Sequence, residues 1–182
     1  GSEAREKLQN RRVLVFGLGG VGGHLTEALA RSGVGTLGIV DSDRVDPTNC
    51  NRQIIALQST IGLPKTEVMG ERLRSIDPTI RIEEFPLRLS SSTLDSFDLA
   101  SWDYIADAID DVPAKLLLIR EARRLGVPIV SSMGTGNKID PSRLRLSTID
   151  KSHTCPLARS IRRELGKEGI RDLRVVFSDE PP

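Results

Sequence analysis

The residues of this sequence with the clearest chemical potential are a glycine-rich turn and two cationic side chains that follow it. The glycines are Gly17, Gly19, Gly20 and Gly22. Glycine lets a backbone approach phosphate closely, and the helix N-terminus after such a turn offers free N–H groups and the positive end of a dipole. Arg52 and Lys65 come later in the chain. Two cations suit a triphosphate and its leaving pyrophosphate, so the pattern favours ATP. A tight turn without a ligand is the alternative for the glycines alone.

Acidic and amide side chains supply further contacts for a nucleotide. Asp41 ends the strand after the turn, where its carboxylate can accept hydrogen bonds from a ribose. Asp43, Asn49 and Gln53 follow within a few positions. The run at 107–111 (DAIDD) ends another apolar strand, and its carboxylates can hold a magnesium ion.

Alternating apolar strands and helices must position these groups. We expect strands at 13–16, 37–40, 80–85, 103–109, 127–131, 144–149 and 175–177. We expect helices at 3–10, after the glycine turn, at 65–76, 113–126 and 156–165, with a short one holding Leu94, Phe97 and Leu99. Continuous apolar runs are typical of parallel strands buried on both faces. The sequence therefore predicts an α/β, Rossmann-like fold, a mostly parallel central sheet with helices on both faces. The acids and the glycine turn then meet at the carboxyl edge of the sheet.

Several polar residues near these motifs receive more local assignments. Lys65 opens a helix, where a cation opposes the dipole, so its placement indicates that it serves an anion; a plain surface lysine is the alternative. We expect Asp107 to be a structural partner, Asp111 to cap a helix, Cys50 to be a small packed residue, and His24 to pack or face solvent.

Composition limits the broad class. The chain has 182 residues and a net charge of +1, which predicts one domain over 1–182 and argues for neither nucleic acid nor membrane. It has no apolar run of membrane-spanning length. Two cysteines fit a reducing cytoplasm better than a disulfide scaffold. Gly1 and Ser2 are interpreted as a cloning remnant. We expect the domain to be truncated at both ends; at the C-terminal end the reason is that a strand at 175–177 should lead into further structure.

The motifs GxGGxG, DxD, NxNRQ, PK and DAIDD, in this order over nearly the whole chain, resemble the ThiF/MoeB family of adenylating enzymes related to ubiquitin activators. The resemblance implies ATP and Mg²⁺ as cofactors and a homodimer. It implies a catalytic group of Arg52, Lys65, Asn49 and Asp110, with Asn49 orienting the α-phosphate and Asp110 binding the metal. Similar proteins carry an upstream arginine that serves the neighbouring subunit; that stretch is missing here, and Arg5 is either its substitute or a solvated helix residue.

The C-terminal part of the sequence indicates which branch of the family the chain resembles most. The patterns DPxxLRxxxxxK at 140–151 and PLAxxxRxxL at 156–165 resemble the branch that dehydrates N6-threonylcarbamoyladenosine in tRNA to its cyclic form. Lys and Arg outnumber Asp and Glu over 151–174, which indicates either tRNA phosphate contacts or a solvated helix face. Adenylation of a ubiquitin-like sulfur carrier is the alternative function, although the paired CxxC zinc motifs of that branch are missing. A third candidate function is that of a nucleotide-binding regulatory or NAD-sensing domain without turnover.

Two features of this part stay open. Cys155 beside His153 is either a reactive thiol or a structural residue. The glycine-rich loop at 133–137 either lines a substrate channel or is a connection that needs positive φ.

Overall fold

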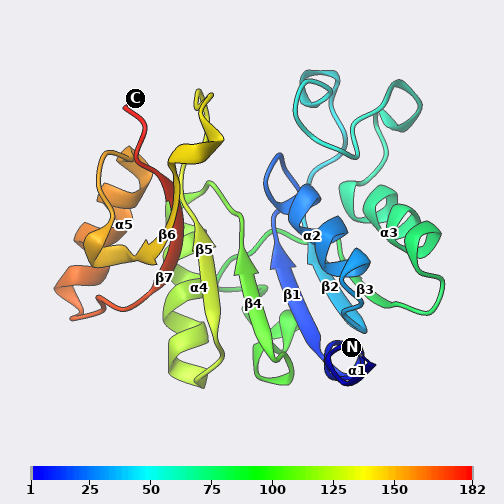
Figure 1. The fold of residues 1–182 in the computed structure, drawn as a ribbon, viewed down its shortest axis with the longest axis horizontal. Coiled ribbons are helices and arrows are strands. Elements are labelled where there is room, and N and C mark those ends of the chain that lie inside the picture. The colour runs from blue at the N-terminus through cyan, green and yellow to red at the C-terminus, as the bar shows by residue number, and fades with distance from the viewer. Residues whose placement is uncertain (1, 182) are drawn as a thin grey trace.

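The computed structural model describes residues 2–181, built around one seven-stranded sheet. Its strands are β1 (Arg12–Phe16), β2 (Thr36–Val40), β3 (Arg81–Phe85), β4 (Tyr104–Asp107), β5 (Ile129–Ser132), β6 (Leu144–Thr148) and β7 (Arg174–Ser178). Their order is β3-β2-β1-β4-β5-β7-β6, and every neighbouring pair is parallel except β6 with β7 (Figure 1). The mostly parallel sheet predicted from the sequence is confirmed.

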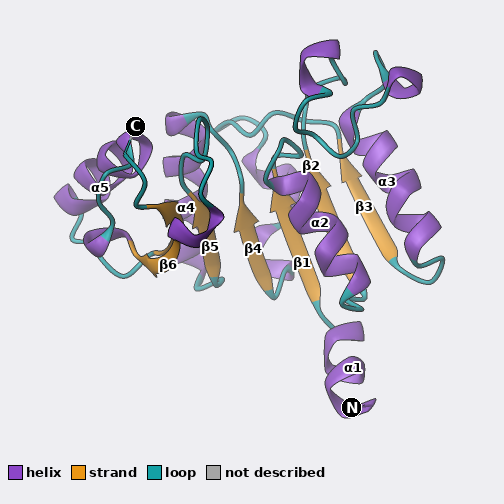
Figure 2. Ribbon diagram, turned by 45° about the horizontal axis from the view of Figure 1, so that its top comes forward, coloured by secondary structure: helices purple, strands orange, loops and turns teal. Residues whose placement is uncertain are grey.

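Helices cover both faces of this sheet, as the sequence predicts (Figures 1 and 2). They are α1 (Ser2–Gln9), α2 (Gly22–Arg31), α3 (Lys65–Ile76), α4 (Val112–Leu125) and α5 (Pro156–Lys167). Alternate residues of β1 divide the core: Val13 and Val15 pack with α2 and α3, whereas Leu14 and Phe16 pack with α4 and α5. Helix α1 has no buried residue and projects from the amino edge of the sheet (Figure 2).

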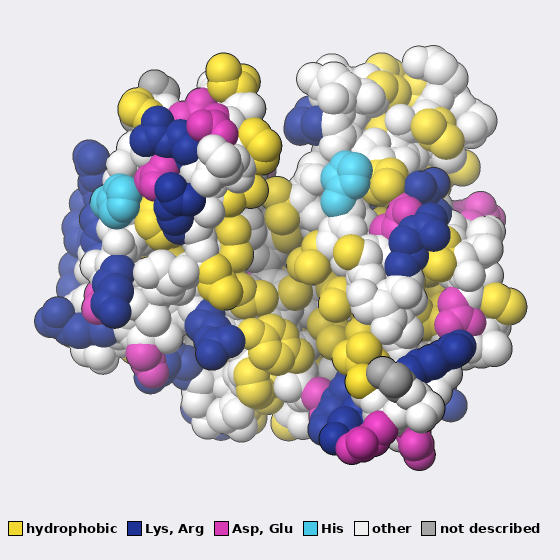
Figure 3. All heavy atoms as spheres, viewed as in Figure 1, with side chains coloured by type: hydrophobic (Ala, Val, Ile, Leu, Met, Phe, Trp, Pro, Cys, Tyr) yellow, Lys and Arg dark blue, Asp and Glu magenta, His cyan; other side chains and the backbone are white. Residues whose placement is uncertain are grey.

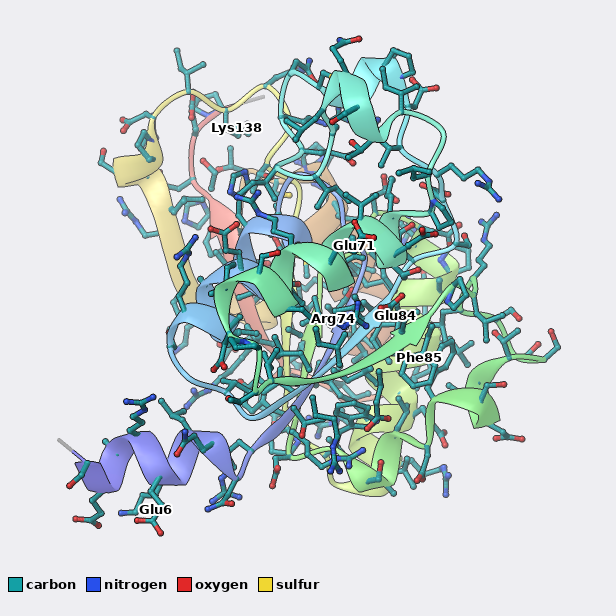
Figure 4. The ribbon with its side chains drawn as sticks, turned by 90° about the vertical axis from the view of Figure 1, so that its right-hand side faces the viewer. Glu6, Glu71, Arg74, Glu84, Phe85 and Lys138 are labelled. Atoms are coloured by element: carbon teal, nitrogen blue, oxygen red, sulfur yellow. The ribbon has the colours of Figure 1, made fainter. Side chains whose placement is uncertain are left out.

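Helix α3 lies closely against the edge strand β3. A Cβ atom at Gly70 would lie 2.3 Å from Glu84 Oε1, so a larger residue here would have to displace the end of the Glu84 side chain. Arg74, one turn further along α3, donates to the same carboxylate at 2.6 Å (Figure 4). These contacts join α3, which begins at Lys65, to the edge strand.

The structure differs from the sequence prediction between β3 and β4. The short helix expected around Leu94, Phe97 and Leu99 is two 3-10 turns, at Leu94–Phe97 and Leu99–Ser101. Asp98 between them has a φ of 38°, a left-handed conformation that an α-helix cannot continue through. The three apolar side chains still pack against the core.

Parallel pairing places the candidate site residues at one edge of the sheet. Phe16, the last residue of β1, pairs with Val40 at the end of β2 and with Asp107 at the end of β4. The glycine turn, the DxD segment and the DAIDD run therefore leave the sheet side by side. No helix in the described residues is long and apolar enough to cross a membrane.

Candidate active site

A cleft of about 920 Å³ opens over the carboxyl edge of the sheet, in the hollow between the two upper parts of the molecule (Figure 3). It is lined by every residue of the predicted site except Gly22: Gly17, Gly19, Gly20, Asp41, Asp43, Asn49, Arg52, Gln53, Lys65 and Asp110. Segments up to 93 positions apart in the sequence thus share one cavity.

The glycine turn contains two kinds of glycine. Gly17 has a φ of +87°, and a Cβ there would lie 2.8 Å from the carbonyl oxygen of Ala108; one at Gly22 would lie 1.7 Å from the carbonyl oxygen of Gly17. The fold itself therefore demands these two. At Gly19 and Gly20 the nearest neighbours would be ordinary contacts, at 3.8 and 3.5 Å. Their missing side chains leave room above the turn for a ligand rather than for the protein.

Asp41 joins the glycine turn to the segment after β2. One carboxylate oxygen accepts from the Leu18 N–H at 2.7 Å, and the other accepts from the Asp43 N–H at 2.9 Å. A carboxylate has about four acceptor positions, so each oxygen retains capacity for a ribose hydroxyl. Asp41 thus fixes the turn and can also bind sugar.

Lys65 places a cation in the wall of the cleft. The residue is 5% exposed, and its ammonium lies 2.9 Å from the exposed carboxylate of Asp43. The Lys65 N–H also donates to the Asp43 carbonyl oxygen, at 3.0 Å. The sequence predicts that this lysine serves an anion, and in the described structure that anion is a side chain. A phosphate in the cleft would share or replace Asp43 as its partner.

The segment between β2 and α3 carries the other polar groups of this wall. Arg52 is exposed, and its guanidinium donates to the Thr48 carbonyl oxygen and the Asn51 side chain at 3.1 and 3.0 Å. Asn49 is nearly buried and its side-chain oxygen accepts from the Asp46 N–H at 3.2 Å. Gln53 is 7% exposed, and its Oε1 has no hydrogen-bond partner among residues 2–181. Cys50, expected to be packed, is exposed, because it follows a 3-10 turn at the surface.

Hydrogen bonds from Thr48 to Asp46 organise the start of this segment. The Thr48 hydroxyl and then its N–H donate to Asp46, and they hold the pKa of that carboxyl below its ordinary value. Asp46 stays ionised and caps the turn Pro47–Asn49.

The three acids of the DAIDD run have different partners. Asp107 is buried and accepts from the Lys115 ammonium, the Ser131 hydroxyl and the Ile109 N–H at 2.8, 2.6 and 3.0 Å. Asp111 accepts from the N–H of the third residue of α4 and caps that helix. The structural assignments of both are confirmed. Asp110 is exposed to the cleft and has no hydrogen-bond or ion-pair partner among residues 2–181.

The donor set decides what kind of metal site is possible. Residues 2–181 hold no cluster of three or more His, Cys, Asp and Glu side chains that could bind a metal by themselves. The carboxylate of Asp110, which has no partner among residues 2–181, fits Mg²⁺, because that ion is usually bound by one or two carboxylates together with substrate phosphates and water.

The chain is similar in sequence to proteins of one known family. The ThiF family model matches residues 1–164. The chain belongs to the ThiF family. It is 44% identical over 183 residues to the tRNA threonylcarbamoyladenosine dehydratase of Bacillus subtilis, covering 100% of this chain and 72% of that protein. It is 36% identical over 130 residues to the sulfur carrier protein adenylyltransferase of Thermus thermophilus, covering 71% and 48%.

The fold of this ThiF family chain matches that of a solved structure. The crystal structure of the Escherichia coli tRNA N6-threonylcarbamoyladenosine dehydratase in complex with ATP matches with a TM-score of 0.95 and 35% identity. The match covers 100% of this chain and 78% of that one. The suspected family and the α/β fold are thereby confirmed.

Sequence reasoning missed one wall of the cleft in this ThiF family member. Leu87 and Leu89 line it together with Ala114 of α4, and Arg88 lies between them with its guanidinium 3.0 Å from Asp111. An apolar patch in the same cleft as Asp41 suits a nucleobase. The available signal was the alternation Leu-Arg-Leu directly after the third strand.

The C-terminal cysteine has a structural place. Cys155 is 2% exposed, and its sulfur accepts from the Ala158 N–H at 3.4 Å, which makes it the cap of α5. Its neighbour His153 turns away and packs edge-on against Phe177. Of the two readings left open by the sequence, the structure favours the structural one.

Proposed function

We propose that this chain is an ATP-dependent dehydratase that adenylates the threonylcarbamoyl carboxylate of N6-threonylcarbamoyladenosine in tRNA and promotes its cyclisation. The observation that carries the proposal is the cleft itself: a glycine turn with two open glycines faces Arg52 and the buried Lys65, in a fold that matches an ATP-bound dehydratase. The sulfur-carrier adenylyltransferase matches a smaller part of the chain.

The reaction proceeds in two steps. The substrate carboxylate attacks the α-phosphorus of ATP, the bond to the bridging β-phosphate oxygen breaks, and pyrophosphate leaves. An oxygen or nitrogen of the same threonylcarbamoyl side chain then displaces AMP and closes the ring. The first step needs no strong general base, because the carboxylate is ionised at neutral pH.

Each side chain of the cleft has a role in this proposal. The phosphates lie over Gly19 and Gly20, where the fold leaves space. Asp41 accepts from the ribose. Arg52 and Lys65 neutralise the charge that develops on the departing pyrophosphate, which lowers the barrier to its departure. Three further residues support these contacts: Asn49 orients the α-phosphate, Gln53 donates to phosphate oxygen, and Asp43 holds Lys65 in place.

Magnesium is part of the same proposal. Asp110 is the one acid of the DAIDD run without a structural partner among residues 2–181, so it is the residue left to bind Mg²⁺. When bound there, the ion would supply positive charge that neutralises the phosphates.

The partners follow from the proposed substrate and the family resemblance. We assign tRNA as the macromolecular substrate, a homodimer as the assembly and the cytoplasm as the compartment. In the basic C-terminal part, Arg163 and Lys167 pair with Glu164, whereas Arg159 has no ion pair within residues 2–181. Arg159, near the start of α5, is therefore the better candidate for a tRNA phosphate.

The test is ATP–pyrophosphate exchange. It is measured with tRNA that carries threonylcarbamoyladenosine and, separately, with a sulfur carrier ending in Gly-Gly. We expect exchange that requires the tRNA, together with loss of one water from the modified nucleoside. Arg52→Ala and Lys65→Ala should lower the exchange rate at unchanged fold. Arg124→Ala is the matched control, because Arg124 is exposed and pairs only with Glu121 on its own helix. Exchange that requires only the sulfur carrier would refute the proposal.

A further inference from the structure

The cleft extends beyond the part that the nucleotide motifs occupy. Its far wall consists of the loop after β5, residues 132–136, together with Leu157 of α5, which we call the β5 rim. Arg52 and Lys65 follow β2, and the sheet order places β1 and β4 between β2 and β5. Three strand spacings amount to about 14 Å. The groups proposed to bind the nucleotide follow β1, β2, β3 and β4, and none of them follows β5, so the β5 rim is left for another group.

The β5 rim presents hydrogen-bond donors that the protein does not use. Within residues 2–181, the backbone N–H groups of Gly134, Thr135 and Gly136 and the hydroxyl of Thr135 make no hydrogen bond. Exposed polar groups in loops often meet water, but these line a cavity at the carboxyl end of a strand, where ligands bind in open α/β sheets. Three successive free N–H groups form an acceptor-binding surface for carboxylate and carbonyl oxygen.

The loop is anchored on both sides of these free donors. Before them, the Met133 N–H donates to the Val176 carbonyl oxygen of β7 at 2.8 Å. After them, the Lys138 ammonium donates to the carbonyl oxygens of Glu180 and Pro181 at 2.8 and 2.7 Å, and the Glu180 carboxylate accepts from the Ile139 N–H at 3.1 Å. Figure 4 shows Lys138 on this upper part of the molecule. The donors are therefore held in place rather than left on a free loop.

The glycines of the β5 rim are not explained by backbone strain. Neither Gly134 nor Gly136 has a positive φ. The positive φ that was one of the two expectations for the loop is found at Asn137, at 60°, after the free donors. A Cβ at Gly136 would meet no atom within 4 Å. As at Gly19 and Gly20, the fold itself does not require a glycine at this position.

We infer that the β5 rim binds the threonylcarbamoyl group of the substrate, with the Thr135 hydroxyl and the N–H groups of 134–136 donating to its urea and carboxylate oxygens. The inference rests on the proposed function. Residues 132–136 include no Lys or Arg, so neutral donors orient the carboxylate and leave its charge available to attack phosphorus. Leu157 provides an apolar surface for the threonine methyl group.

The test separates substrate binding from nucleotide binding. Thr135→Val keeps the shape of the side chain and removes the hydroxyl, Thr135→Ser keeps the hydroxyl, and Gly136→Leu fills the β5 rim. Gly166→Leu is the matched control, because a Cβ at Gly166 also meets nothing within 4 Å and this glycine lies outside the cleft, on α5. Two quantities are measured for each variant: the dissociation constant of ATP, and kcat/KM for tRNA carrying threonylcarbamoyladenosine.

We expect Thr135→Val and Gly136→Leu to lower kcat/KM for the tRNA about tenfold, the effect of one lost hydrogen bond to a charged group. The ATP dissociation constant should stay within about twofold, and Thr135→Ser and Gly166→Leu should match the wild type. Unchanged kcat/KM in both variants would overturn the inference, and equally weakened ATP binding would assign the β5 rim to the nucleotide. A wild-type chain that binds ATP without tRNA-dependent turnover would overturn the proposed function, and the inference with it.

Discussion

Replacing Lys115 by methionine removes one half of an ion pair that is closed to solvent. The Lys115 ammonium lies 2.8 Å from Asp107 Oδ2, and both side chains are 0% exposed. Methionine fills similar space without a charge, so Asp107 is left as a buried carboxylate. Removing one partner of a buried pair costs about 3–5 kcal/mol. Ser131 and the Ile109 N–H still donate to Asp107 at 2.6 and 3.0 Å, so we expect the lower end, about 3 kcal/mol.

Urea-induced unfolding in the absence of ATP measures this loss. With a slope of about 2 kcal/mol per molar urea, the midpoint should fall by about 1.5 M at unchanged slope. The double variant Asp107→Asn with Lys115→Met removes both charges and should recover part of the stability. Lys7→Met is the matched control, because Lys7 pairs with Glu3 on exposed α1, and such pairs contribute at most about 1 kcal/mol.

Lys115→Met should also weaken ATP binding. Asp107 accepts from the Ile109 N–H and so holds the loop that carries Asp110 into the cleft. A midpoint for Lys115→Met no lower than that of the Lys7→Met control would refute the reasoning, since it would mean that Asp107 is stable at this position without the cation.

Three other predictions concern single residues. Gly19→Ala should keep the wild-type melting temperature while raising the dissociation constant of ATP, whereas Gly17→Ala should unfold more easily; equal melting temperatures would contradict this. Hydrogen bonds from Arg72 and then Arg31 hold the pKa of Glu27 below its ordinary value. The ionised Glu27 therefore stabilises the fold, by less than about 1 kcal/mol. This stabilisation is complete above about pH 4.3 and is lost as the pH falls through the folded pKa. Glu27→Gln and wild type should therefore differ in free energy of unfolding at pH 7 and converge in acid. Cys155→Ser should keep full turnover, since serine caps a helix equally well, and a loss of turnover would revive the reactive-thiol interpretation.

Most of the residues predicted for the site line one cleft, because the sequence signals for them are local. The spacing of the glycine turn, the acid at the end of β2 and the run after β4 each identify a strand end. Once the strands are parallel, their carboxyl ends share an edge, so the convergence of Gly17, Asp41 and Asp110 followed from the pattern alone.

Contacts between distant segments were not available in this way. Lys65 was assigned to an anion, but only the folded chain brings the Asp43 carboxylate to 2.9 Å from it. Cys155 next to His153 resembles a reactive pair in the sequence, yet α5 takes the thiol as its cap and the imidazole packs on Phe177. The exposure of Cys50 likewise depends on a 3-10 turn that no periodicity announces.

The sequence by itself determined the fold class, the edge of the sheet where the cleft opens and most of the predicted residues that line it, because periodicity and turn chemistry act over a few residues. Only the tertiary structure decided which of the three acids after β4 remains available, which glycines leave space for a ligand and which donors of the loop after β5 are free. The physical reason is that hydrogen-bond partners and empty volume are properties of packed neighbours, and the neighbours of a residue are set by every element that folds against it.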